Sequence, residues 1–142
     1  MVSYQWAQQA LFQWTRIDML LALLEETLRV LESLQQLTRT GKLTTAEKET
    51  ERLWQRGRLL VGALLSGVNP QVGETGRLCL RLYEFVMHVL EQKRLESLSG
   101  AVEVLRTLQE AFQAVRAEAI ALERNGEIPS LDNVGLYSGV LV

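Results

Sequence analysis

The chain has 142 residues, of which 47% are hydrophobic and 23% are charged, and its formal net charge is −2. A chain of this length is about one domain and can bury a core of its own. Its nearly balanced charge provides no global basic field for a phosphate backbone, so we expect no nucleic-acid partner. The single cysteine cannot form an internal disulfide, and nothing in the cysteine count indicates an oxidising compartment.

Neither a secretory signal nor a membrane span is expected. Residues 1–14, MVSYQWAQQALFQW, have no basic stretch followed by an apolar run. No segment approaches the roughly 20 apolar residues of a membrane-spanning helix. We therefore predict a soluble cytoplasmic protein without membrane insertion, in which the aromatic residues of the N-terminal segment cap the fold.

The first predicted helix covers residues 15–39 and carries two apolar stripes. Thr15 can be its N-cap, with Asp18 completing a variant of the capping box, and Gly41 ends it. At about 100° per residue, one stripe faces the core; it comprises Ile17, Leu20, Leu21, Leu24, Leu28 and Leu31. The second stripe lies beside it and comprises Met19, Leu23, Val30 and Leu37.

Two further helices are predicted in the middle of the chain. One begins at Thr44 or Thr45, with Glu47 as its capping partner, and ends near Ser66 before the loop GVNPQVG. Its predicted inward residues are Leu53, Gly57, Leu60, Val61 and Leu64. The next covers residues 74–93 and is predicted to be buried on most sides, because its polar arc is narrow. This arc comprises Arg77, Arg81, Glu84, His88 and Gln92.

The last predicted helix covers residues 97–124, and Asn125-Gly126 can supply its C-cap. Its packing seam comprises Leu98, Ala101, Leu105, Leu108, Phe112, Val115 and Ala119. Short connections favour antiparallel neighbours, so we predict an all-α protein built as an antiparallel four-helix bundle. The bundle takes residues 15–124, between a short N-terminal cap segment (1–14) and a C-terminal apolar tail (125–142).

Catalytic and metal-binding residue types are scarce. The chain has one histidine, two aspartates and no glycine-rich phosphate loop, so we predict no enzyme, no cofactor and no metal. Glu84 and His88 could both reach a metal, but a di-metal bundle needs Glu-x-x-His pairs on two helices, and we interpret the two residues as surface groups. A metal-dependent bundle enzyme stays an alternative. Cys79 is predicted to be a buried, unreactive thiol.

The apolar surface exceeds what a four-helix core requires. A bundle helix needs a stripe of somewhat more than ~100°, whereas the first helix has its second stripe and the last helix adds Val104 and Ala111 beside its seam. The N-terminal segment, the C-terminal tail or a homodimer interface could cover this surface. Alternatively, it forms a groove for the amphipathic helices of a client. The tail is expected either to pack on its own bundle or to occupy that groove.

Three stretches resemble the flagellar secretion chaperones of the FliS family. They are TRIDMLLALLEETLRVL (15–31), LCLRLYEFVMHVL (78–90) and LRTLQEAF (105–112), and their order and spacing agree with the family. The residues that match the family's first motif in kind are Thr15, Leu20, Leu21, Leu23, Leu28, Arg29 and Leu31. Arg16, Leu24 and Glu26 stand where the family usually has proline, tyrosine and glycine, so the chain resembles a divergent member.

The resemblance implies a cytoplasmic bundle that binds the disordered C-terminal part of flagellin, prevents premature polymerisation and presents the client to the flagellar type III export gate. From their helical positions, the predicted client contacts are Met19, Leu23, Val30, Leu37, Val104 and Ala111. Tyr4 is carried over from the family's N-terminal Tyr-Gln, with an implied role in covering the groove when no client is bound. The alternative is a structural or regulatory homodimer with no export client.

Overall fold

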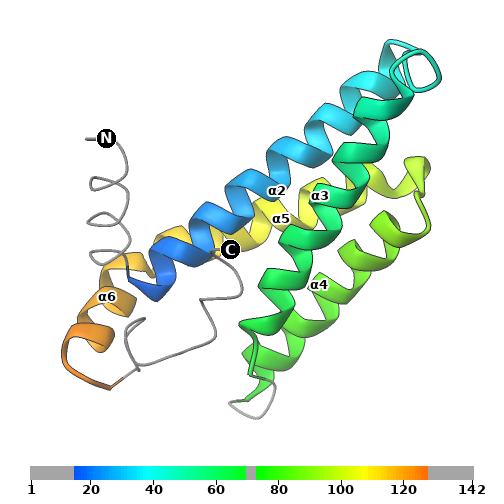
Figure 1. The fold of residues 1–142 in the computed structure, drawn as a ribbon. Coiled ribbons are helices and arrows are strands. Elements are labelled where there is room, and N and C mark those ends of the chain that lie inside the picture. The colour runs from blue at the N-terminus through cyan, green and yellow to red at the C-terminus, as the bar shows by residue number, and fades with distance from the viewer. Residues whose placement is uncertain (1–14, 70–72, 128–142) are drawn as a thin grey trace, which may run out of the picture. The chain divides into compact units, whose positions relative to one another are not determined.

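The computed structural model describes residues 15–69 and 73–127, and in these ranges it contains helices and no strand (Figure 1). The elements are α2 (Arg16–Arg39), α3 (Glu47–Ser66), α4 (Glu74–Glu91), the short 3-10 helix η2 (Leu95–Ser97), α5 (Leu98–Ala114) and α6 (Arg116–Arg124). The predicted all-α class is confirmed. None of the described helices combines the length and the apolar character that crossing a membrane requires. The predicted cap segment with Tyr4, and the tail beyond residue 127, lie outside the described residues.

The chain forms two compact units. The larger unit consists of residues 23–109 and contains α3, α4 and most of α2 and α5. Of the described residues, the smaller unit has 15–22 and 110–127, with the start of α2, the end of α5 and α6.

Local signals in the sequence set several helix ends as predicted. Gly41 after α2 has a φ of 68°, and the next N–H, that of Lys42, donates to the Leu37 carbonyl at 2.9 Å. Gly126 after α6 has a φ of 78° and the same arrangement, a Schellman motif in which a left-handed residue lets the chain satisfy a carbonyl of the last turn. The left-handed residue after α4 is Lys93, with a φ of 49°. Because Lys93 is not a glycine, the sequence has no C-cap signal at this position. The predicted end of α4 was therefore two residues too late.

The two predicted N-caps have different outcomes. The Asp18 N–H donates to Thr15 Oγ1 at 3.4 Å and the Thr15 hydroxyl donates to Asp18 Oδ2 at 2.9 Å, which confirms the cap of α2. The predicted cap of α3 is wrong, since that helix begins at Glu47 without a side-chain cap. The Thr45 hydroxyl donates instead to the Lys42 carbonyl at 3.3 Å, within the turn that precedes the helix.

The prediction of one continuous helix over residues 97–124 is also wrong. Val115 separates α5 from α6 with φ −105° and ψ 8°, and its N–H donates to the Phe112 carbonyl three residues back, at 3.2 Å. Val115 is therefore 45% exposed rather than buried in the seam. The break contains no proline or glycine, and the apolar periodicity of the sequence continues across it. No local signal in the sequence therefore marks the end of α5.

The core of the larger unit is one buried stripe from each of its four helices. The stripes are Leu24, Leu28, Val30, Leu31 and Leu34 of α2, Trp54, Val61 and Leu64 of α3, Cys79, Tyr83, Val86, Val89 and Leu90 of α4, and Leu98, Ala101, Val102, Leu105 and Leu108 of α5. Trp54, which is 3% exposed, was not among the residues predicted to face inward. It was also wrong that α4 is buried on most sides, because Leu78 and Phe85 are exposed.

Helices α3 and α4 lie side by side and form the closest pair among the described helices (Figure 1). Gly57 allows this approach, because a Cβ atom at this position would lie 3.0 Å from Leu90 Cδ2. At one end of the pair, Lys93 Nζ lies 2.6 Å from Glu51 Oε2. A small residue in the contact thus replaces the larger side chains that usually separate packed helices.

Candidate functional site

The second apolar stripe of α2 faces α3 along part of its length. Val30 is 3% exposed, and its Cγ1 lies 3.5 Å from the position of a Cβ atom at Gly57. On the same side of α2, Glu26 forms an ion pair of 3.3 Å with Arg56 of α3. The stripe at Val30 is therefore covered by α3 of the same chain.

This arrangement separates the residues predicted as client contacts. Met19 and Val30 are buried, with 6% and 3% of their surface exposed, so the expectation that they lie on an open face is wrong. Leu23, Leu37 and Val104 are half-buried, and Ala111 is exposed. Tyr4 lies outside the described residues. A helical wheel shows how wide an apolar arc is, but it does not show which neighbouring helix covers it.

A different apolar surface lies along α4 and α5 of the larger unit. Leu78 and Phe85 are two turns apart on α4 and expose 55% and 41% of their surface, with half-buried Leu82 between them. Phe85 Cζ lies 3.7 Å from the position of a Cβ atom at Gly100, so the phenyl ring lies against α5. Val104, one turn after Gly100 on the same side of α5, is half-buried. We call Leu78, Leu82, Phe85, Gly100 and Val104 the α4–α5 surface.

Helical periodicity explains why α4 contributes to both the core and this surface. Its core stripe runs through Cys79, Tyr83 and Val86, and the residues directly before these lie about 100° away around the helix. These preceding residues are Leu78, Leu82 and Phe85. They were not among the predicted contacts, because α4, with its wide apolar arc, was expected to be buried on most sides. The width of that arc was the signal that could have identified them.

Several charged residues border the α4–α5 surface, among them exposed Glu74, one turn before Leu78, and exposed Glu84, directly before Phe85. Arg81 lies one turn from both Leu78 and Phe85, on the margin of α4 farther from α5, and Glu103 lies directly before Val104 on the margin of α5 farther from α4. Both side chains are exposed. Neither forms an ion pair with a residue in 15–69 or 73–127. The surface therefore has charges of both signs along α4 and the Glu103 carboxylate along α5.

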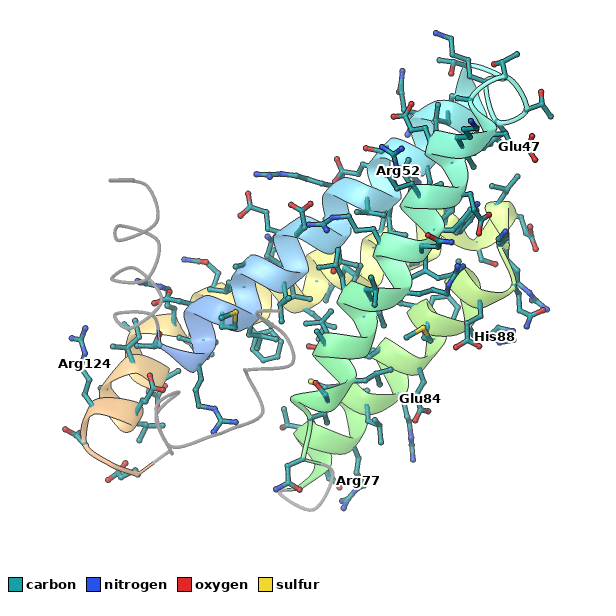
Figure 2. All side chains as sticks on the ribbon, viewed as in Figure 1. Glu47, Arg52, Arg77, Glu84, His88 and Arg124 are labelled. Carbon is teal, nitrogen blue, oxygen red and sulfur yellow. The ribbon has the colours of Figure 1, made fainter. Side chains whose placement is uncertain are left out.

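The polar arc of α4 lies on the outside of the helix, as predicted. Figure 2 shows Arg77, Glu84 and His88 projecting away from the helix, and all three are exposed. Within the described ranges, no group of three or more His, Cys, Asp or Glu side chains could hold a metal ion. Cys79 is buried, and burial raises the pKa of its thiol, as expected for a structural cysteine. Burial also raises the pKa of Tyr83.

In the smaller unit, charged groups join α6 to the start of α2. Arg116 Nε donates to Asp18 Oδ1 at 2.7 Å, and both carboxylate oxygens of Glu123 accept from the Arg16 N–H at 3.3 Å. No residue of α6 is buried. The two carboxylates lie at the N-terminus of α2, where the helix dipole favours negative charge.

Comparison of the chain with known family models, curated proteins and solved structures found no match.

Proposed function

We propose that this protein is a cytoplasmic export chaperone of the FliS type, which binds the C-terminal segment of flagellin on its α4–α5 surface. The observation that carries the proposal is the exposure of Leu78 and Phe85. Single exposed leucines are ordinary, but an apolar surface that continues from one helix to the next is typical of a binding site. The stretch 78–90 that carries these residues is also one of the three that resemble the FliS family, and this supports the client class and delivery to the export gate.

The proposal includes an antiparallel four-helix bundle for residues 23–109. Contacts between α3 and α4 support it, because Gly57 and Gly62 follow one another along α3 while the side chains nearest to them, Leu90 and Met87, follow in the reverse order along α4. Such a bundle exposes the outer sides of two adjacent helices to a client.

The energetics require several contacts at once. A client segment that is disordered when free loses conformational entropy as it becomes helical on the surface. Burial of apolar area contributes about 25 cal/mol of favourable free energy per Å². Leu78 and Phe85 are already partly covered before binding, so these two residues alone can bury little additional area. We therefore expect the client to extend beyond these two residues. Leu23, Leu37, Val104 and Ala111 remain predicted contacts, and Val104 lies within the α4–α5 surface.

The test is calorimetric titration of the full chain with a flagellin C-terminal peptide. Leu78→Glu should weaken binding at least about tenfold, because a charge would enter the apolar contact at a cost above ~1.4 kcal/mol. The matched control is Leu59→Glu, at a leucine of α3 that is 75% exposed and outside the α4–α5 surface. The control should bind as the unmodified chain does, and both variants should keep its circular dichroism and melting temperature. Equal binding by both variants would contradict the proposal.

Light scattering distinguishes the proposal from a homodimer. A chaperone should be monomeric when free and should form a complex of defined stoichiometry with the peptide. A dimer that Leu78→Glu dissociates, and that binds no peptide, would assign the same surface to a second copy of the chain.

A further inference from the structure

The break between α5 and α6 has no cause within its own stretch of sequence. Val115 has φ −105° and ψ 8°, between the helical and the extended regions, and its N–H donates to the Phe112 carbonyl, three residues back rather than four. Residues 111–124, AFQAVRAEAIALER, contain five alanines and neither glycine nor proline. Alanine, glutamate, arginine and leucine favour a helix interior, so the local sequence favours one helix that continues through Val115.

The start of α6 has no side-chain cap. Its N-cap residue is Val115, whose side chain has no oxygen that could accept an N–H of the first turn. Continuation of α5 through this residue would instead give the Val115 N–H a carbonyl four residues back, as in the rest of a helix. Local hydrogen bonding therefore favours the continuous helix as well.

Two polar contacts join α6 to the start of α2. Arg116, directly after the break, donates from Nε to Asp18 Oδ1 at 2.7 Å. The Glu123 carboxylate, near the other end of α6, accepts the Arg16 N–H at 3.3 Å. Both contacts lie within the smaller unit. No residue of α6 is buried, so this helix can leave α2 without moving a buried side chain of its own into water.

The backbone at Val115 and these two contacts depend on each other. A helical residue has a φ of about −63° and a ψ of about −42°, so continuation of the helix would turn the two dihedral angles of Val115 by roughly 40–50° each. Glu123 lies about 12 Å beyond Val115 at 1.5 Å per residue. A rotation of this size would move its carboxylate by several ångströms, and the Arg16 N–H would lose its acceptor.

We infer that α5 and α6 form a two-state hinge at Val115. In the bent form, Asp18 and Glu123 hold α6 against the first turn of α2. In the other form these contacts are broken, residues 98–124 are a single helix, and the first turn of α2 is uncovered. Helix continuation, which the local sequence favours, thus competes with two contacts between residues that are distant in the sequence. The hinge does not depend on the proposed function, since it involves no residue of the α4–α5 surface.

The NMR chemical shift of the Val115 Cα atom in the full chain tests the inference, because this shift differs between a helical, a bent and an unfolded backbone. The double variant Asp18→Asn, Glu123→Ala removes both contacts and keeps a capping side chain at the start of α2. Its Val115 shift should move towards the value of a helical valine. The ratio of continuous to bent molecules should rise about four- to 25-fold, because each partly exposed contact contributes a factor of about two to five.

The matched control is Glu118→Ala, which makes the same substitution at an exposed position of the same helix. It should leave the Val115 shift as it is in the unmodified chain. Unchanged backbone shifts in α3 and α4 would show that both variants keep the fold. Amide exchange alone does not distinguish the outcomes, because the free end of a helix and an unfolded segment both exchange faster than a helix held at both ends.

Two results would overturn the inference. A Val115 shift that moves towards the value of an unfolded valine in the double variant would mean that α6 unfolds when it is released. A shift equal to that of the unmodified chain would mean that the bend belongs to residues 111–124 themselves and that the contacts with α2 do not hold it.

Discussion

Arg116 and Asp18, which are 98 positions apart in the sequence, connect the first turns of α6 and α2. Arg116 Nε lies 2.7 Å from Asp18 Oδ1. The second oxygen of the same carboxylate accepts the Thr15 hydroxyl at 2.9 Å. Asp18 therefore completes the N-cap of α2 and holds α6 at the same time. No residue of α6 is buried, so these polar contacts are a distinct part of what holds this helix in the smaller unit.

Removal of the Asp18 charge should loosen α6. Asp18→Asn keeps a capping side chain but loses the ion pair, and the amide protons of residues 116–124 should then exchange faster with deuterium. The pair is partly exposed, with 25% of the Asp18 side chain and 43% of the Arg116 side chain accessible, so the change in global stability should be small. Glu118→Gln, at an exposed residue of α6, is the control and should change exchange little. Equal exchange in the two variants would show that the ion pair does not hold α6.

The same contact should depend on pH in the acidic range. The hydrogen bond from Arg116, followed by that from Thr15, lowers the pKa of Asp18 below its ordinary value, although burial opposes this shift. A carboxylate with a lowered pKa in the folded state contributes stability that is present above the unfolded pKa of about 3.9 and is lost as pH falls through the folded value. The difference in unfolding free energy between the unmodified chain and Asp18→Asn should therefore be constant above about pH 5 and should decrease below about pH 4. Urea denaturation at several pH values measures it, and a difference that increases with acidity would contradict the assignment.

Local chemistry explains which parts of the fold the sequence could predict. Gly41, Gly126 and the Thr15–Asp18 cap act within one turn of their helices, and all three were predicted correctly. Val115 and Lys93 were not, because neither residue type marks a helix end by itself. At Val115 the change in backbone accompanies a contact between distant residues, Arg116 and Asp18, which no local pattern encodes.

The candidate site shows the same division. Helical spacing predicted that the chain has apolar surface beyond a simple core, and exposed Leu78 and Phe85 confirm this. It did not predict which side of which helix stays open. Val30 is covered because Gly57 on α3 leaves room for a neighbouring helix, and this depends on a residue of another helix. The predicted client contacts were consequently placed on α2 and α5 rather than on α4.

Two glycines of α3 should respond differently to alanine. At Gly57, a Cβ atom would lie 3.0 Å from Leu90 Cδ2, and Leu90 is fully buried, so the gain in helix propensity of about 1 kcal/mol should be cancelled or exceeded by overpacking. At Gly62, the nearest atom is Met87 Cε at 4.0 Å. Gly62→Ala should therefore stabilise the protein by about 0.5–1 kcal/mol, whereas Gly57→Ala should be neutral or destabilising by up to about 2 kcal/mol. Urea denaturation tests both variants, and an equal gain would mean that α3 and α4 do not require a small residue at Gly57.

The covered part of the α2 stripe should behave as core. Val30→Ala removes two methyl groups from an interior site that is 3% exposed, and it should cost about 1–3 kcal/mol of unfolding free energy. Leu24→Ala, at a fully buried residue of the first stripe, should cost about 2–5 kcal/mol and serves as the core reference. Leu37→Ala, at a half-buried residue of the second stripe near the end of α2, should cost less than either. If Val30→Ala left stability unchanged while it weakened binding of the flagellin peptide, the stripe would be open to the client in solution and its burial against α3 would not persist. Thermal and urea unfolding of the three variants, with peptide titration of each, distinguish these two outcomes.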